Sequence, residues 1–389
     1  MKLFILTSRF PHPLEKGDKL RIFRQIRELS RYNDLVLCAL TEEAVKREDF
    51  EVVEQYCSKI YILHRSKWLI FKNILKTFTK PMPMQVGYFF DAKLKKKIEK
   101  IIDKEKPDHL YCQLIRTAQY VRDLDYPKTL DYMDAFSVIA RRWAKHATFP
   151  LNKLLEKEAQ KITDFEKAVF DDFDRHSIIS EQDKAQFNFR GSDQIEVIPN
   201  GVDLNFFHLI ETAEKKYDLV FVGNMGYRPN VEAVKFLVKK ALPLALRKCP
   251  ELKVLIAGAR PALEIKRLAS RSVQVSGWVE DIRTAYASAD IFVAPLFLGS
   301  GLQNKILEAM AMGIPCLTTQ QVNNAIQAVP EESILIAESA EEFAKKMVLL
   351  KQSKDLRTKI RQNGLAFVRE NYSWEIFGKQ LNQLITREL

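Results

Sequence analysis

Two successive alternations of short apolar runs with longer amphipathic runs constrain the fold of this chain more than any other feature. The first begins with the apolar run "KLFILTS" at 2–8, continues with "DLVLCALT" at 34–41 and ends near "HSIIS" at 176–180. Between its first two apolar runs, residues 18–32 place Leu20, Phe23, Ile26 and Leu29 on one helical stripe. Buried strands alternating with helices predict a mostly parallel sheet covered on both faces.

The second alternation follows a break in the pattern. The break contains the turn signal Pro-Asn-Gly within "IEVIPNGVDLNFFH" at 195–208. Apolar runs resume with "YDLVFVG" at 217–223 and include "ADIFVAPL" at 289–296. The sequence therefore predicts an α/β chain with two doubly wound domains.

These patterns also set the expected domain boundaries. We expect an N-terminal domain over 1–205, a C-terminal domain over 206–370, and a final helix over 371–389 that packs back towards the N-terminal domain. Two such domains that face each other leave a cleft between them. Ligands of doubly wound sheets bind beyond the carboxyl ends of the strands, so functional residues should follow strands in both halves.

The charge of the chain favours an anionic partner. The formal net charge is +11, and residues 59–106 contain 13 Lys and Arg against 4 Asp and Glu. Such a surplus suits a nucleotide, a phosphorylated substrate or a lipid headgroup. No nucleic-acid motif of a known kind is present, so no nucleic-acid partner is expected.

The cysteines and the N-terminus favour a cytoplasmic protein. The five cysteines form no CxxC pair, and we expect reduced thiols that pack as small apolar side chains. The apolar start "MKLFILTSRFPHP" soon meets Arg9 and two prolines, which predicts a first buried strand rather than a signal peptide.

The stretch "FLGSGLQNKILEAMAMG" at 297–313 indicates a site for a phosphorylated ligand. Gly299 and Gly301 permit close approach to the start of a helix, whose unpaired N–H groups attract phosphate. Lys305 in the first turn adds a full positive charge, and Glu308 can accept hydrogen bonds from ribose hydroxyls. The alternative interpretation is a plain loop followed by a helix with a surface glutamate.

These residues and their surroundings resemble the retaining, nucleotide-sugar-dependent glycosyltransferases of family 4, which have the GT-B fold. "VSGWVEDIRTAYASADIFVAPLFLGSGLQNKILEAMAMGIPCLTT" is similar to the donor-binding core of that family, and "FVGNMGYRPNVEAVKFLV" to its first C-terminal strand, loop and helix. "SRFPHPLEKGDKLRIFRQIRELSRYNDLVLCAL" resembles a bacterial exopolysaccharide-type branch. The resemblance implies a hexosyltransferase that takes its sugar from a nucleotide-diphosphate sugar.

The resemblance also supplies the expected donor-binding residues. They are Gly17, Gly223, Asn224, Trp278, Val279, Gly299, Ser300, Gly301, Leu302 and Glu308. Ser300 stands where many members carry a first glutamate near the donor sugar, which puts the sugar contacts in doubt. Many members also grip the diphosphate with an Arg directly after the glycine of the first C-terminal loop and a Lys further on. Here Arg228 and Lys305 are the cations expected to replace that pair.

The chemistry of retaining transfer directs attention to one further carboxylate. The reaction needs stabilisation of charge on the leaving diphosphate and positioning of the acceptor hydroxyl. "TLDYMDAFS" ends a strand, and by position its Asp131 and Asp134 are expected to point towards the cleft. Asp134 is our candidate catalytic residue with Lys305 and Arg228, and its alternative role is to cap the following helix.

Two local features allow further expectations about helix caps and metals. Asp18 is expected to cap the helix that begins after Gly17, and Asp281 the helix after the "GWVED" turn. No cofactor is expected: the chain lacks a DxD motif in a suitable loop, and "DDFD" at 171–174 lies in an acidic helix end. Helix dipoles and cations would then stabilise the diphosphate without a metal.

Residues 66–81 suggest a contact with a membrane. The stretch "SKWLIFKNILKTFTKP" mixes apolar and basic side chains as an amphipathic helix on an anionic bilayer would. A peripheral enzyme on the inner face of the cell membrane, acting on a glycan or lipid-linked glycan, would use such a helix. The alternative is a helix that packs its apolar face on the domain and keeps its lysines in water.

The sequence leaves the function open at two levels. A glycosyltransferase of cell-surface polysaccharide biosynthesis is the leading interpretation. A sugar-nucleotide epimerase of the same fold and an inactive nucleotide-sugar-binding protein are the alternatives, the latter because of Ser300. The residues do not separate uridine from guanosine donors.

Overall fold

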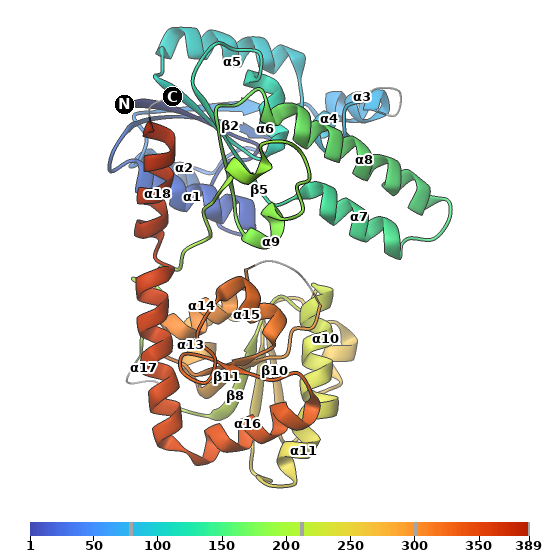
Figure 1. Cartoon of the computed structure of the whole chain (residues 1–389), viewed down its shortest axis with the longest axis vertical. Helices are drawn as coiled ribbons and strands as arrows, with labels where there is room; N and C mark the ends of the chain where they lie inside the picture. Colours follow the sequence, from blue (N-terminus) through green and yellow to red (C-terminus); the bar gives the residue numbers. More distant parts are fainter. Residues whose placement is uncertain (78–80, 211–213, 299–301, 388–389) are drawn as a thin grey trace. The chain divides into compact units, whose positions relative to one another are not determined.

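The computed structural model describes residues 1–77, 81–210, 214–298 and 302–387. The chain divides into two compact units. Unit 1 comprises Met1–Pro199 and Trp374–Leu389, and unit 2 comprises Asn200–Ser373. Each unit contains one parallel sheet flanked by helices (Figure 1).

The described part of unit 1 contains a seven-stranded parallel sheet in the order β3-β2-β1-β4-β5-β6-β7. In register, Leu3 of β1 lies between Leu35 of β2 and His109 of β4. The strands are β1 (Lys2–Thr7), β2 (Asp34–Thr41), β3 (Lys59–His64), β4 (His109–Gln113), β5 (Lys128–Met133), β6 (Arg175–Ile178) and β7 (Glu196–Val197).

Helices cover both faces of this sheet. Phe4 and Leu6 of β1 pack in one cluster with Ile98 and Ile102 of α5, and α1 covers the other face, where its Gln25 accepts a hydrogen bond from the Tyr111 hydroxyl. The helices of unit 1 are α1 (Gly17–Leu29), α2 (Arg47–Glu54), α3 (Lys67–Thr77), α4 (Met84–Phe89), α5 (Ala92–Glu105), α6 (Ile115–Val121), α7 (Phe136–His146), α8 (Leu151–Phe170), α9 (Glu181–Lys184), the 3-10 turn η1 (Ser192–Gln194) and α18 (Trp374–Thr386).

The last helix of the chain, α18, packs on α1 of unit 1. Gly378 lies so close to α1 that a Cβ there would stand 2.3 Å from Cβ of Glu28. Asn33 donates a hydrogen bond from Nδ2 to Oδ1 of Asn382 at 2.7 Å. A small residue at the crossing therefore lets the two helices meet closely.

The described part of unit 2 contains a six-stranded parallel sheet in the order β10-β9-β8-β11-β12-β13. Its strands are β8 (Tyr217–Val222), β9 (Val254–Ala257), β10 (Val273–Gly277), β11 (Ala289–Ala294), β12 (Cys316–Thr318) and β13 (Leu335–Ile336). Its helices are α10 (Arg228–Phe236), the π-helix η2 (Leu237–Ala241), α11 (Leu242–Leu246), α12 (Leu263–Lys266), α13 (Ile282–Ala287), α14 (Asn304–Ala311), α15 (Gln320–Ile326), α16 (Ala340–Gln352) and α17 (Lys354–Asn371).

The predicted α/β class and the two Rossmann-like sheets are confirmed. In each sheet the chain starts at a central strand, moves outward in one direction, and then returns to the centre to continue in the other. The reversal lies between β1 and β4 in unit 1 and between β8 and β11 in unit 2. Ligands of such sheets bind at this switch point, beyond the carboxyl ends of the two central strands.

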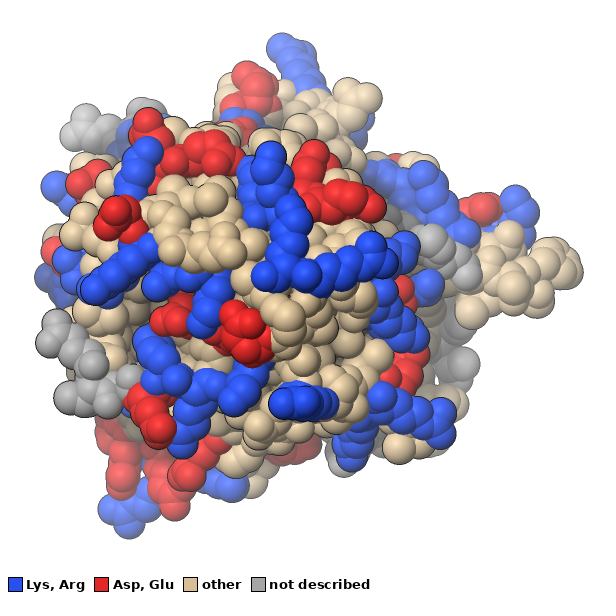
Figure 2. Space-filling view, turned by 90° about the horizontal axis from the view of Figure 1, so that it is seen from below, with Lys and Arg blue, Asp and Glu red and all other residues tan. Residues whose placement is uncertain are grey.

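The surface charge is mixed in the view of Figure 2. Lys and Arg side chains are interspersed with Asp and Glu over the face that is shown, so the basic surplus is not gathered into one patch there. The five cysteines are free and buried, and burial raises the pKa of the Cys57 and Cys112 thiols to about 12. They pack as small apolar side chains, as expected.

Candidate functional site

The switch point of unit 2 brings together side chains from the two helices that follow its central strands. Helix α10 follows β8, and helix α14 follows β11. Lys305 lies in the first turn of α14 and donates from Nζ to Oδ1 of Asn230 on α10 at 2.6 Å. Nζ also lies 3.4 Å from Oε1 of Gln303. An ammonium group is thus fixed beyond the carboxyl ends of the two central strands, β8 and β11.

The amide of Asn230 is held from its other end as well. Its Nδ2 donates to the carbonyl oxygen of Asn224, in the loop after β8, at 2.9 Å. Asn230 is 3% exposed, so its oxygen is oriented towards Lys305 by packing and by this bond. Asn230 was not predicted as a site residue, since its helical position gave no signal for a contact with a second helix.

Two glycines make room for this arrangement. A Cβ at Gly223 would stand 2.8 Å from Nδ2 of Asn230. Gly258, at the end of β9, has φ +143°, and a Cβ there would stand 1.8 Å from the carbonyl oxygen of Gly223. The backbone at the ends of β8 and β9 therefore approaches as only glycine permits.

The environment of Lys305 favours loss of the proton from its ammonium group. Burial lowers the pKa of Lys305 to about 8, and the Glu308 carboxylate acts in the opposite direction. Nζ also lies 5.7 Å from the centre of the Phe221 ring. The electrostatic interaction of an anion with such a desolvated ammonium is stronger than its interaction with an exposed lysine.

Glu308 lies one turn further along α14. Its Oε2 accepts a hydrogen bond from the hydroxyl of Tyr286, a fully buried residue of α13, at 2.9 Å. Burial raises the pKa of Glu308, while the bond from Tyr286 and the charge of Lys305 act against that shift. The carboxylate is thus held in one orientation on the same helix as the ammonium, which fits a ligand with phosphate and hydroxyl groups.

The other residues expected in unit 2 are placed as follows. Arg228 is the first residue of α10 and is exposed, Trp278 after β10 is 71% exposed, and Val279 is half-buried. Asp281 caps α13 as expected, since its Oδ1 accepts from the backbone N–H of Arg283 at 3.0 Å.

The loop before α14 is described only in part. Leu302 is half-buried just ahead of the helix. Gly299, Ser300 and Gly301 lie outside the described residues. At the other end of the helix, Gly313 adopts φ +64° just after the C-cap, a conformation that glycine commonly adopts where a helix ends.

Asp134 lies in unit 1 directly after β5. It is half-buried, and burial raises its pKa to about 6, with the carboxylate of Asp183 acting in the same direction. The N-cap of α7 is Ala135, which makes no side-chain cap bond, so Asp134 is not the cap of that helix. A carboxyl group that titrates near neutrality suits proton transfer.

Asp131 does not point towards a cleft, contrary to the expectation from its position. It is fully buried and accepts hydrogen bonds from Arg21 Nε at 2.7 Å and Nη2 at 3.0 Å. Burial alone would raise the pKa of Asp131, but the charge and bonds of Arg21 hold it below its ordinary value. The side chain alternation of a strand explains the error, because Asp131 belongs to the face covered by α1.

The expected cap of α1 was also wrong. The helix begins at Gly17 after Lys16, and Asp18 lies inside its first turn. Instead of capping, Asp18 forms an ion pair with Arg9 and lies 3.7 Å from Nη1 of Arg116. Gly17 itself has ordinary space around it, since a Cβ there would stand 3.6 Å from Cε of Met133.

A group of arginines at the switch point of unit 1 was not predicted from the sequence. The guanidinium carbons of Arg9, Arg65 and Arg116 lie 5.4, 4.3 and 4.8 Å from the centre of the Phe89 ring. Burial lowers the pKa of Arg116 to about 10, and the charge of Arg9 acts in the same direction. Because these residues come from four separate segments, no spacing in the sequence could indicate the group.

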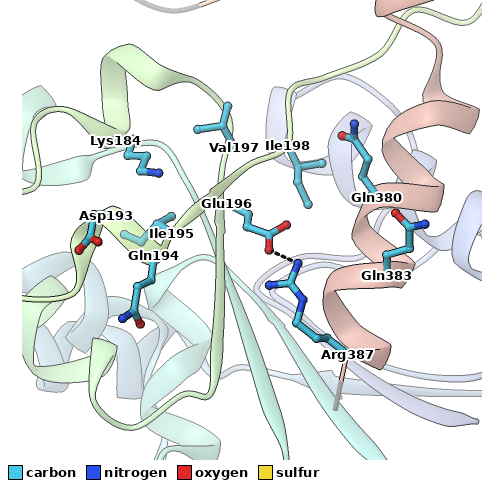
Figure 3. A pocket seen from close by; sticks show the side chains of 10 residues that line it. All are labelled: Lys184, Asp193, Gln194, Ile195, Glu196, Val197, Ile198, Gln380, Gln383 and Arg387. Atoms are coloured by element: carbon cyan, nitrogen blue, oxygen red, sulfur yellow. Dashed lines mark ion pairs between the residues drawn. The ribbon is translucent and has the colours of Figure 1, made fainter. Parts of the chain in front are cut away.

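One pocket of unit 1 lies away from these residues. It has a volume of about 390 Å³ and is lined by β7 and α18, with Arg387 paired to Glu196 at 2.6 Å (Figure 3). It contains none of the predicted site residues.

The described residues offer neither a metal site nor a membrane span. No three His, Cys, Asp or Glu side chains in the described ranges are grouped as metal ligands would be. No helix in the same ranges is both long and apolar enough to cross a bilayer.

The family whose sequence profile matches the chain is "Glycosyl transferases group 1", over residues 216–353. A 44.6 kDa uncharacterised protein in the cps region of Klebsiella pneumoniae is 22% identical, over 95% of this chain and 96% of that protein. A GDP-mannose-dependent phosphatidylinositol monomannoside mannosyltransferase of Corynebacterium glutamicum is 26% identical, over 51% of this chain and 58% of that enzyme.

Solved structures confirm the fold. Sucrose-phosphate synthase from Thermosynechococcus elongatus has a TM-score of 0.70 at 15% identity, over 99% of this chain and 98% of that one. HepE of Anabaena in complex with UDP and glucose has a TM-score of 0.67 at 14% identity, over 99% of both chains. The profile and the relatives together support a glycosyltransferase with the GT-B fold, as predicted.

Proposed function

We propose that this protein is a retaining glycosyltransferase that moves a sugar from a nucleotide-diphosphate sugar to a glycan or a lipid-linked glycan. The observation that carries the proposal is the position of Lys305 and Glu308 one turn apart on α14, with Lys305 bonded to Asn230 at the switch point. The profile match over 216–353 covers these residues. HepE, a protein of the same fold, binds UDP and glucose, which supports a nucleotide-sugar donor.

Each side chain of α14 would have a distinct role towards the donor. When the donor binds, Lys305 would either break its hydrogen bond to Asn230 or keep it with one of its N–H groups. It would donate hydrogen bonds to the diphosphate together with the N-terminal N–H groups of α14. Glu308 would accept hydrogen bonds from the ribose hydroxyls. Because the diphosphate gains negative charge as the sugar leaves, an ammonium already fixed there stabilises the transition state more than the ground state.

Unit 1 would contribute Asp134 and the surface that receives the acceptor. The carboxyl group of Asp134 is half-buried and burial raises its pKa to about 6, so it can take up or release a proton near neutral pH. Arg228, the exposed cation at the start of α10, stays our second candidate for contact with the diphosphate.

We further propose a role in cell-surface polysaccharide biosynthesis on the cytoplasmic side of the membrane. The protein from the cps region of Klebsiella pneumoniae and the mannosyltransferase that acts on a phosphatidylinositol mannoside support such a setting. Residues 66–81 would contact the membrane through α3, where Trp68 is 74% and Phe71 57% exposed. Residues 78–80 of this segment lie outside the described ranges.

The test is a donor screen with purified protein. Thermal shift across UDP and GDP sugars identifies the donor, since a ligand at about 100 times its Kd stabilises the fold by about 2.7 kcal/mol. Release of nucleoside diphosphate with an acceptor present then measures transfer, and NMR of the product reports the anomeric configuration. We expect activity to persist in EDTA, because cations of the chain would stabilise the leaving group.

Matched variants make the screen decisive. Lys305→Ala should raise KM for the donor or lower kcat at least tenfold, because a charge-assisted phosphate contact is worth about 1.5–3 kcal/mol. Lys266→Ala, at an exposed lysine of α12, should leave the kinetics unchanged. Full activity of Lys305→Ala, or thermal stabilisation by no nucleotide sugar at all, would reject the proposal.

A further inference from the structure

The hairpin formed by α7 and α8 exposes large apolar side chains at its end. Phe149 is 80% exposed, Leu151 52% and Leu154 38%, and Trp143 near the end of α7 is 66% exposed. We call residues 143–157 the hairpin tip. Four large apolar side chains are thus exposed within 12 residues of one hairpin, a local concentration that marks a candidate interaction surface.

The tip extends beyond the body of unit 1 (Figure 1). The buried residues of α8 begin at Glu158, whose Oε1 accepts from the backbone N–H of Met84 at 2.6 Å. Lys161 donates to the carbonyl oxygen of Thr77 at 2.5 Å, so the segment around α3 and α4 lies against the middle of α8. At 1.5 Å per helical residue, Leu151 stands roughly 10 Å beyond Glu158.

The charges on the tip are mainly positive. Lys145, Lys153 and Lys157 are exposed, and Glu156 is the opposing carboxylate, paired with Lys153 at 3.0 Å. An end that exposes aromatic and aliphatic side chains together with three lysines fits the interface of a lipid bilayer. The apolar side chains can enter the acyl boundary there, while the lysines reach lipid phosphates.

We propose that the hairpin tip inserts into the surface of an anionic membrane and holds the protein there. The proposal concerns a segment that the donor site does not use, so it stands or falls separately from glycosyl transfer. The bilayer is the occupant that the charges favour, because its phosphates complement the three lysines and its interface accommodates aromatic rings. A second copy of this chain would instead bring the same lysines together.

The test is co-sedimentation of the full chain with vesicles of phosphatidylcholine containing about 30% phosphatidylglycerol. Phe149→Ser/Leu151→Ser should weaken binding at least tenfold. Leu263→Ser/Leu349→Ser removes two exposed leucines of unit 2, 70% and 45% exposed, and should bind as the wild type does. Equal binding of the tip variant and the wild type would overturn the proposal.

Three further measurements distinguish insertion of the tip from binding through α3 and from self-association. Trp68→Ser/Phe71→Ser tests α3, and loss of binding in that variant alone would also overturn the proposal. Brominated lipids should quench wild-type fluorescence more than that of Trp143→Phe, since Trp143 would lie at the acyl boundary. A dimer in solution that the tip variant converts to monomer, without vesicle binding by the wild type, would assign the tip to a second copy instead.

Discussion

Raising the pH from 7 to 9 should weaken the binding of a nucleoside diphosphate about tenfold, because Lys305 loses its proton in that interval. Burial lowers the pKa of Lys305 to about 8 in the free protein. The bound diphosphate favours the charged ammonium, so it raises this pKa. Affinity is therefore fully present well below pH 8 and falls as the pH rises through the pKa of the free protein.

The magnitude follows from the titration of one group. With a pKa of about 8, Lys305 is roughly nine-tenths protonated at pH 7 and one-tenth protonated at pH 9. If the bound pKa lies well above 9, Kd rises as the inverse of the protonated fraction of the free protein, which is about tenfold or 1.4 kcal/mol. At pH 8, binding should take up about half a proton per site.

Isothermal titration calorimetry with UDP and GDP between pH 7 and pH 9 measures both quantities. Repeating the titration at pH 8 in buffers of different ionisation enthalpy gives the proton uptake. Lys305→Arg stays charged throughout and corrects for titration of the nucleotide itself. A wild-type profile that runs parallel to that of Lys305→Arg, with no proton uptake at pH 8, would refute the role given to Lys305.

Three further predictions concern other carboxylates and their partners. Glu308→Gln should raise the Kd of the nucleotide about tenfold, while Tyr286→Phe should change it less than threefold, as measured by calorimetry. A larger effect of Tyr286→Phe than of Glu308→Gln would show that the ribose does not bind to Glu308. Asp134→Asn should lower kcat at least a hundredfold. The rate of the wild type should fall below about pH 6 as the carboxylate is protonated. The same fall in rate below pH 6 in the variant would contradict this role of Asp134. Arg21→Ala should lower the free energy of unfolding by about 3–5 kcal/mol in urea titrations, because it leaves the buried charge of Asp131 unpaired; a loss below about 1 kcal/mol would show that the pair is unimportant.

The alternation of strands and helices was sufficient to predict the sheets, because the central strands β1, β2, β8 and β11 are buried apolar runs and long helices such as α1 have one apolar stripe. The predicted runs at 2–8, 34–41 and 217–223 coincide with β1, β2 and β8 to within a residue or two. The strands β7 and β13 were not predicted, since two residues each are too short to show a period.

The candidate site was predictable only where its residues share one segment. Lys305 and Glu308 lie on one helix, so their spacing alone placed them together. Asn230 and Tyr286 meet these side chains from other helices through packing, which no local pattern records. Asp131 shows the reverse case, in which a position near the end of a strand suggested function while the pleat directed the side chain to Arg21 in the core.

A crystal structure of the protein with bound UDP or GDP tests the central claim most directly. We expect the diphosphate at the start of α14, within hydrogen-bond distance of Nζ of Lys305, and the ribose hydroxyls on the carboxylate of Glu308. A nucleotide bound elsewhere, with Lys305 still bonded only to Asn230 and Gln303 at an empty helix start, would contradict it.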